Sequence, residues 1–188
     1  MNTAKLKQFG EEQWRGKGDK INAELFVMTY GALVKQLWED YEDIGAVNSA
    51  LDRMGYGIGV RLIEEFLAKH SPGLAKCRVF AETADVVASV GFKVFLNASV
   101  GVSHITHDEY SLTLLDNPLN RFVALPDSAV EKGLLYSNIL AGCVRGALEM
   151  VNMHTAVTFT EDELLGHQHT TINVKLLNYI DEHVPDDE

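Results

Sequence analysis

The sequence contains few cysteines. Only Cys77 and Cys143 occur among 188 residues, and they do not form a CxxC pair. Small secreted domains rely on several disulfides, and a structural zinc ion takes four ligands, mostly cysteine and histidine. Two separated cysteines therefore argue against a disulfide scaffold and a cysteine zinc centre, and they fit a reducing cytosol.

The sequence is also poor in positive charge. The 16 Lys and Arg residues are outnumbered by 27 Asp and Glu residues, which gives a net charge of -11. Because phosphate groups are bound by basic surfaces, this balance argues against a nucleic-acid partner and against broad adhesion to anionic lipid. Lys69, His70, Lys76 and Arg78 lie close together, which predicts either one locally basic face or, more commonly, a solvated surface.

Long apolar runs are missing as well. None approaches the roughly 20 residues that a membrane-spanning helix needs, so we expect any membrane contact to be peripheral. Residues 1–22 are polar, without an apolar stretch of signal-peptide length, and are predicted to form a flexible arm. The hydrophobic share of 46% is that of a globular protein, and residues 23–184 are expected to fold as one domain. Residues 185–188 are expected to be a mobile acidic tail.

Apolar residues recur at helical spacing in four segments. The pattern predicts helices over residues 24–41, 47–70, 82–95 and 128–151. Three glycines between residues 55 and 59 predict a bend or a close approach of another backbone, because glycine costs about 1 kcal/mol relative to alanine inside a helix. In the last helix Arg145 and Glu149 lie one turn apart and are able to pair.

Alternating apolar and polar residues predict strands in the second half of the chain. They cover residues 104–115, 155–159 and 171–177, with a short strand at 122–125. The last two long strands are expected to form a hairpin around Gly166. Helices that come first and strands that come mostly later, without βαβ alternation, predict an α+β fold with an antiparallel sheet.

Two motifs that suggest ligand binding are weak. The glycines at 55, 57 and 59 superficially suggest a dinucleotide loop, but that loop follows a strand and needs a third glycine at another spacing. His167 and His169 form a close pair in a polar loop, yet a metal ion needs more ligands than two. We therefore expect neither a nucleotide nor a metal cofactor.

The sharpest feature is Cys77 with the helix that follows it. Ala81, Ala84, Ala88 and Gly91 recur at helical steps and form a stripe of minimal side chains, and Cys77 stands four residues before Ala81. If the helix extends back by one turn, the thiol lies at the head of a groove that suits an alkyl chain. The apolar walls are expected from Val87, Val90, Val94 and Phe95. On the residues alone, close packing of another element against the stripe is the commoner use of such a pattern.

The neighbours of Cys77 predict a reactive thiol. Lys76 and Arg78 flank it near the start of a helix, and positive neighbours lower the pKa of a thiol. Cys77 is therefore a candidate acylation site. The competing use is a catalytic nucleophile, for which folding would have to supply a base such as His104, His107 or His154. Cys143 lies on the apolar face of the last helix and is expected to be a small core residue.

Segments spread over most of the chain carry a family resemblance. They read ELF at 24–26, TYGALV at 29–34, DRMG at 52–55, IGVRLIE at 58–64, ETADVVA at 82–88, LYSN at 135–138 and RGALEMV at 145–151. Through them, from Ala23 to about Pro185, the chain resembles the subunit 3 family of the trafficking protein particle (TRAPP) complex. Matches this long and in this order are far more specific than the glycine pattern.

The resemblance implies a fold in which helices cover one side of an antiparallel, roughly four-stranded sheet around an internal hydrophobic tunnel. It implies palmitate bound to Cys77 as a thioester, with the acyl chain running into the tunnel, and no catalytic site. The residues expected to line the tunnel are Ala81, Ala84, Val87, Ala88 and Gly91.

The resemblance also implies partners and a place of action. The partners are related small TRAPP subunits, in a heterodimer or, for the isolated chain, a homodimer. The assembled complex tethers vesicles between endoplasmic reticulum and Golgi and promotes nucleotide exchange on a Rab-family GTPase, close to residues 181–188. We expect a cytoplasmic protein that associates peripherally with cis-Golgi and endoplasmic reticulum membranes. Two other functions stay open: an acyl-binding or acyl-transfer enzyme that uses Cys77, and a small-molecule sensor that uses the same cavity.

Overall fold

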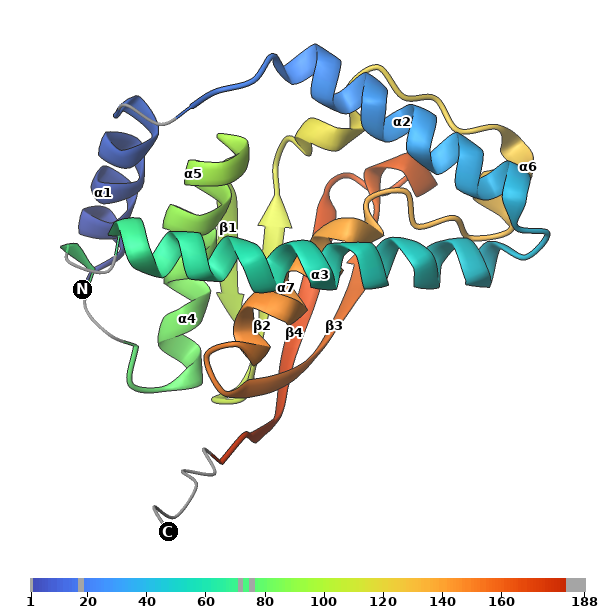
Figure 1. Ribbon diagram of the computed structural model, residues 1–188. Helices are drawn as coiled ribbons and strands as arrows, with labels where there is room; N and C mark the ends of the chain where they lie inside the picture. The colour runs from blue at the N-terminus through green and yellow to red at the C-terminus, as the bar shows by residue number, and fades with distance from the viewer. Residues whose placement is uncertain (1, 17–18, 71–72, 75–76, 182–188) are drawn as a thin grey trace, which may run out of the picture.

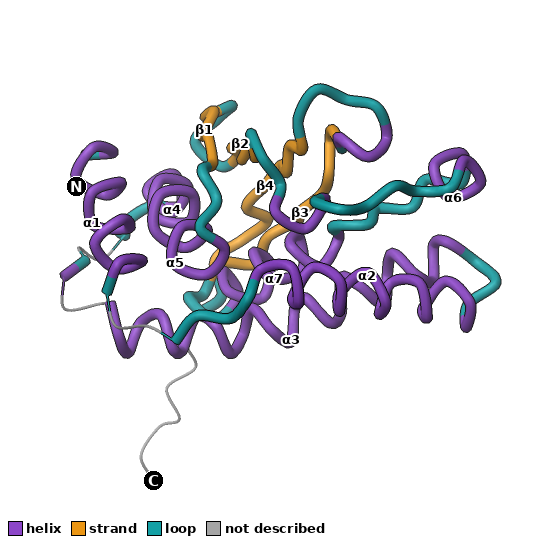
Figure 2. Tube along the Cα trace, turned by 90° about the horizontal axis from the view of Figure 1, so that it is seen from above, coloured by secondary structure: helices purple, strands orange, loops and turns teal. Residues whose placement is uncertain are grey.

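The fold is built on one antiparallel sheet with helices on one of its sides. A computed structural model describes residues 2–16, 19–70, 73–74 and 77–181. The sheet has the order β1-β2-β4-β3, and Figures 1 and 2 show the long helices gathered on one side of it. Its strands are β1 (Val100–His104), β2 (Glu109–Leu114), β3 (Met153–Glu161) and β4 (Thr170–Tyr179). The predicted α+β class with a four-stranded antiparallel sheet is confirmed.

The central strands supply the floor of the core. Tyr110, Leu112 and Leu114 of β2 are at most 1% exposed, and they alternate with partly exposed polar residues. Ile172 and Val174 of β4 are fully buried beside them. A period of two residues puts one face of each strand against the helices, as the sequence pattern predicts.

The strands agree with the sequence in part. The predicted hairpin is confirmed, because β3 pairs with β4 through a turn that contains the short helix η4 (Glu163–Leu165). The single strand expected at 104–115 is instead the end of β1, a turn and β2. The strand expected at 122–125 is wrong, since this segment follows the short helix η3 (Pro118–Asn120) as a turn and loop in which Phe122 has a φ of 64°.

Two long helices come before the sheet in the sequence. Helix α2 (Ala23–Asp40) leads into α3 (Ile44–His70), and both agree with the predicted ranges. The helix expected at 128–151 is two helices, α6 (Asp127–Glu131) and α7 (Asn138–Glu149). Gly133, with a φ of +72°, lies in the turn after α6, where a left-handed backbone favours glycine.

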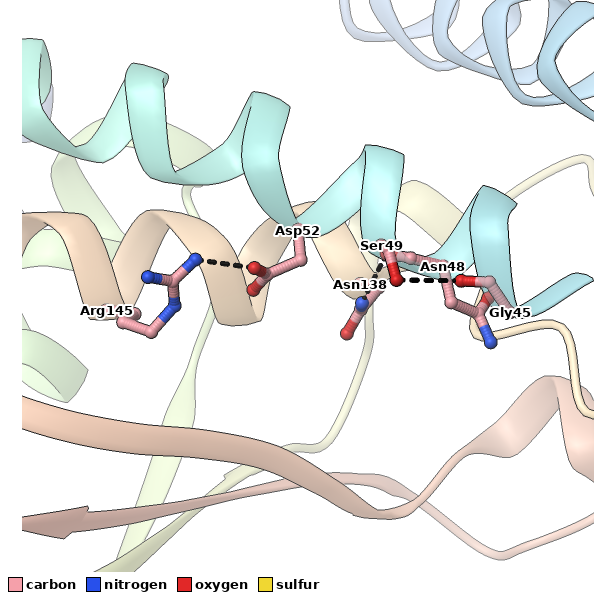
Figure 3. Close-up of polar contacts among 6 residues, drawn as sticks. All are labelled: Gly45, Asn48, Ser49, Asp52, Asn138 and Arg145. Carbon is pink, nitrogen blue, oxygen red and sulfur yellow. Dashed lines mark hydrogen bonds and ion pairs between the residues drawn. The ribbon is translucent and has the colours of Figure 1, made fainter.

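Helices α3 and α7 approach until their backbones touch. A Cβ atom on Gly55 or Gly59 would lie 2.1 Å from a backbone oxygen of α7, so glycine is required at both positions. The predicted close approach of another backbone is therefore confirmed, and the glycines lie inside a continuous helix. Figure 3 shows the polar contacts beside this seam: Arg145 pairs with Asp52 at 2.5 Å, and the Asn138 amide donates to the Asn48 carbonyl at 2.8 Å.

An additional helix lies in the segment that the sequence predicted as a flexible arm. Helix α1 (Thr3–Arg15) begins at Asn2, whose side chain accepts the N–H of Lys5. Leu6 is 4% exposed and packs with Phe66 and Val90 in a second apolar cluster, separate from the main core. The helix forms because its few apolar side chains share one face and find this cluster, a contact between distant parts of the chain.

The helix that follows Cys77 has three parts. They are α4 (Phe80–Val86), a π-helical turn η2 (Val87–Gly91) and α5 (Phe92–Leu96). Asn97 ends it in the left-handed conformation with a φ of 52°, at the expected position. Figure 1 shows this composite helix between α1 and the sheet, so it contributes to both apolar clusters.

Candidate functional site

Cys77 lies in the loop between α3 and α4, three residues before the first residue of α4. Its side chain is half-buried, and its thiol is free. The helix does not extend back by one turn to Cys77, because α4 begins at Phe80, with Val79 in an extended conformation as its N-cap. Lys76 lies outside the described residues.

The electrostatic surroundings of Cys77 also differ from the prediction. Burial raises the pKa of the Cys77 thiol, and the nearby carboxylate of Glu82 raises this pKa further. Glu82 is held there by the backbone N–H of Arg78, which donates to it at 2.6 Å. The thiol is therefore less ionised at neutral pH than a free cysteine.

Two residues of the predicted alanine and glycine stripe reach the main core. Ala84 is 0% and Ala88 is 2% exposed, and Val87 packs at the edge of the same cluster. Ala81 at the start of the stripe is half-buried. Ala84 and Ala88 thus stand side by side on the face that looks toward the sheet, as a helical step of four residues requires.

Gly91 does not continue this line. The π-turn Val87–Gly91 holds one residue more than an α-turn, so the positions after it are rotated out of the α-helical register. Gly91 is half-buried, and a Cβ atom there would find the Val86 carbonyl oxygen at 4.0 Å as its nearest neighbour among the described residues. The protein itself leaves room for a side chain at this position.

The expected apolar walls are divided between two clusters. Val87 belongs to the main core, whereas Val90, Val94 and Phe95 pack in the second cluster with Leu6 of α1. The walls predicted from these three residues therefore do not face Ala84 and Ala88. The neighbours of the stripe in the core are aromatic instead, with the Phe80 and Tyr110 rings stacked at 4.8 Å.

Sequence reasoning missed the aromatic and polar residues around the stripe. The Tyr110 hydroxyl lies 3.2 Å from the Thr83 hydroxyl, and both residues are buried. Phe80 donates its backbone N–H to the Tyr179 hydroxyl at 3.2 Å, which fixes the start of α4 to the end of β4. These residues come from three distant segments of the chain, so no local sequence pattern predicts their contacts. The sequence did contain a local signal for α1, because Leu6 and Phe9 lie three residues apart, on one face of a helix.

The other candidate residues, Cys143 and His167, make contacts that are typical of structural residues. Burial raises the pKa of the Cys143 thiol to about 12, and this residue packs between α3 and α7 as expected for a core cysteine. His167 Nδ1 lies 3.1 Å from the Asp162 carbonyl oxygen in the β3–β4 turn. Within the part of the chain that the structure describes, no three metal-binding side chains come together. The helices described there include none with the length and apolarity needed to cross a membrane.

A family model described as transport protein particle (TRAPP) component matches residues 26–175. The chain belongs to the TRAPP component family. It is 53% identical to trafficking protein particle complex subunit 3 of Dictyostelium discoideum, over 90% of both chains. It is 50% identical to transport protein particle subunit bet3 of Schizosaccharomyces pombe, over 95% of this chain and 96% of that one. As a TRAPP component, the chain functions in vesicle transport.

Solved structures show the same fold. A TRAPP complex subunit 3 from Naegleria fowleri, covalently bound to palmitic acid, superimposes with a TM-score of 0.82 at 45% identity, covering 87% of this chain and all of that one. The phenol-responsive sensory domain of PoxR aligns over 94% of this chain and 90% of its own, with a TM-score of 0.62 but only 12% identity. The second likeness shows a shared fold and nothing about ligands.

Proposed function

We propose that this TRAPP component is a structural, non-catalytic subunit that carries palmitate as a thioester on Cys77. The observation that carries the proposal is the half-buried Cys77 thiol, placed just before a helix whose Ala84 and Ala88 lie in the core. The Naegleria relative, which is covalently bound to palmitic acid, supports it. The raised pKa of Cys77 favours storage over turnover, because a nucleophile acts as the thiolate.

The acyl chain would be a component of the core. Burying a chain of palmitoyl length contributes on the order of 10 kcal/mol, at about 0.8 kcal/mol for each CH₂ group. A contribution of this size is comparable to the whole stability of a domain. A buried chain does not anchor the protein, so membrane attachment would come from the protein surface and its partners.

Intact mass spectrometry tests the acylation. Native protein from a eukaryotic host is expected to carry a palmitoyl mass that resists hydroxylamine while folded and is released once the protein is unfolded. Cys77→Ser should lose this mass, whereas the matched control Cys143→Ser should keep it. An unmodified Cys77, or an adduct that survives in Cys77→Ser, would remove the acyl group from the proposed function.

A second variant tests where the acyl chain runs. Ala88 is 2% exposed in the core, so Ala88→Leu should fill the space beside the helix and reduce the acylated fraction although Cys77 is intact. Undiminished acylation in a folded Ala88→Leu protein would place the chain elsewhere and rule out the proposed lining by Ala81, Ala84, Val87, Ala88 and Gly91.

We further propose that the chain pairs through α2 with a related small TRAPP subunit, or with a second copy of itself when isolated. Helix α2 exposes Leu25 at 66% and Met28 at 68%, an apolar surface that a monomer rarely presents to water. Analytical ultracentrifugation should show a dimer that Met28→Glu converts to monomer. Lys35→Glu, at an exposed polar position of the same helix, should leave the dimer intact.

The assembled complex is proposed to act between endoplasmic reticulum and Golgi and to promote nucleotide exchange on a Rab-family GTPase. The family resemblance supports this part, and the chain would supply surface to the exchange site. Residues 182–188 of the expected contact lie outside the described residues. A complex that contains the chain without residues 181–188 should assemble normally but exchange nucleotide more slowly. Unchanged exchange would separate the tail from the GTPase.

A further inference from the structure

Strand β1 is an edge of the sheet that lacks the usual protection. It pairs with β2 in an unbroken register from Val100 to His104 and, among the described residues, with no other strand. The opposite edge, β3, carries two register shifts, and such bulges discourage further pairing. β1 contains no proline, lysine, glutamate or bulge, so it lacks these barriers to pairing with another strand.

The free backbone groups of β1 follow from its pairing. Ile105 donates its N–H to the carbonyl of Glu109, its cross-strand partner in the continued register. In an antiparallel pair, successive residues turn their N–H and C=O groups alternately toward the partner strand and away from it. The backbone groups of Val100, Val102 and His104 therefore point outward. They span about 13 Å at roughly 3.3 Å per residue.

A hollow runs beside these groups. Its volume is about 310 Å³, and β1 forms one wall. The other walls come from the first turns of α1 and from the α4–η2 helix. The lining residues are Thr3, Lys7, Asp85, Ser89, Val100, Gly101, Val102 and His104. Space beside unpaired strand groups is the arrangement that proteins use to bind an extended peptide by strand addition.

The charges of the hollow select the peptide. Lys7 is exposed on its α1 wall and forms no ion pair with another described residue. The Asp85 carboxylate on the other wall already accepts the Thr3 hydroxyl at 3.2 Å. An extended segment with Asp or Glu opposite Lys7 would therefore complete the site, in a protein whose net charge of -11 otherwise repels acidic partners.

We propose that the outer edge of β1 is a docking site where a partner protein adds one extended segment, with its backbone paired to Val100, Val102 and His104 and a carboxylate on Lys7. A ladder of backbone donors and acceptors at strand spacing is matched by another extended backbone and by few small molecules. The site uses neither Cys77 nor α2, so it stands apart from the proposed acylation and pairing.

A peptide library tests this site on the full chain. The probe is a displayed library of ten-residue peptides in which Val or Thr alternates with any residue. We expect enriched peptides to contain Asp or Glu and to shift the backbone amide signals of Val102 and His104 in NMR spectra. Failure to enrich any peptide, or signals that move at β3 or α2 instead, would overturn the proposal.

Three variants complete the test. Val102→Pro removes an outward N–H and should weaken binding at least tenfold, while the fold persists because an edge strand tolerates proline where its N–H faces solvent. Lys7→Glu should weaken acidic peptides severalfold and admit basic ones, without touching the β1 backbone. Lys5→Glu, on the same helix but outside the hollow, should bind like the parent chain. Equal binding by folded Val102→Pro and the parent would overturn strand addition.

Discussion

The contact between α3 and α7 allows a sharp prediction about Gly59. A Cβ atom on Gly59 would lie 2.1 Å from the Cys143 carbonyl oxygen and 2.9 Å from its Cα. Both atoms belong to a helix backbone, which cannot turn aside as a side chain can. To restore an ordinary contact of 3.4 Å, α7 would have to move by about 1.3 Å.

Two opposing effects determine how Gly59→Ala changes the free energy of unfolding. Overpacking a core typically costs 1–3 kcal/mol, and we expect about 3 kcal/mol because backbone meets backbone. Alanine in a helix interior is more stable than glycine by about 1 kcal/mol. The free energy of unfolding should therefore fall by about 2 kcal/mol, which for a chain of this length lowers Tm by roughly 4–8 °C.

Gly57 provides the matched control two residues away. A Cβ atom there would meet only the Arg61 guanidinium, at 3.6 Å, which is ordinary contact with a flexible side chain. Gly57→Ala should therefore raise the stability by up to about 1 kcal/mol. Urea unfolding followed by circular dichroism, in a Cys77→Ser background that removes acyl heterogeneity, measures both. If Gly59→Ala matched or exceeded the parent in stability, the backbone contact between α3 and α7 would be refuted.

Three further predictions concern α1, Cys77 and the β3–β4 turn. Leu6→Ala should cost about 2 kcal/mol and speed amide exchange throughout α1, because Leu6 is 4% exposed in the second cluster; unchanged exchange would mean that α1 does not depend on this contact. The pKa of the unacylated Cys77 thiol, measured by the pH dependence of alkylation, should lie above that of a free cysteine and fall in Glu82→Gln, since burial and then Glu82 raise it. Burial also raises the pKa of the Asp162 carboxyl, so the folded state holds this proton more tightly than the unfolded state. The contribution of Asp162 to stability is present below its unfolded pKa and is lost as pH rises through its folded pKa. Asp162→Asn should therefore flatten the dependence of the free energy of unfolding on pH between these two pKa values. A pH dependence identical to that of the parent would refute this assignment.

Much of the secondary structure could be read from local patterns. The α2 and α3 helices, the β3–β4 hairpin and the Asn97 helix end follow from periodicity and capping. The errors concentrate where a turn interrupts an apolar pattern without a proline. Gly133 ends α6 inside a run that reads as one long helix, and β1 lies just before the stretch that alternates.

The sequence proposes the residues of the candidate site, whereas their geometry comes from the structure. Cys77, Ala84 and Ala88 were identified from spacing, and the structure places the two alanines together in the core. The helix does not extend back to Cys77, and the predicted lowering of the Cys77 pKa was wrong. Sequence neighbours of Cys77 suggested a positive environment, but burial and the carboxylate of Glu82 determine the pKa of the thiol once the chain folds.

The sequence by itself determined the fold class and the family, and it supplied the residues proposed for the candidate site, because periodicity, small-residue spacing and long motif matches are local properties of the chain. Only the tertiary structure decided what those residues touch. Arg145 could pair with Glu149 one turn away, yet it pairs with Asp52 of α3. The same holds for α1, whose few apolar side chains gain a partner only when Phe66 and Val90 are brought beside them. Contact energies between distant segments depend on burial and distance, and neither exists until the chain is folded.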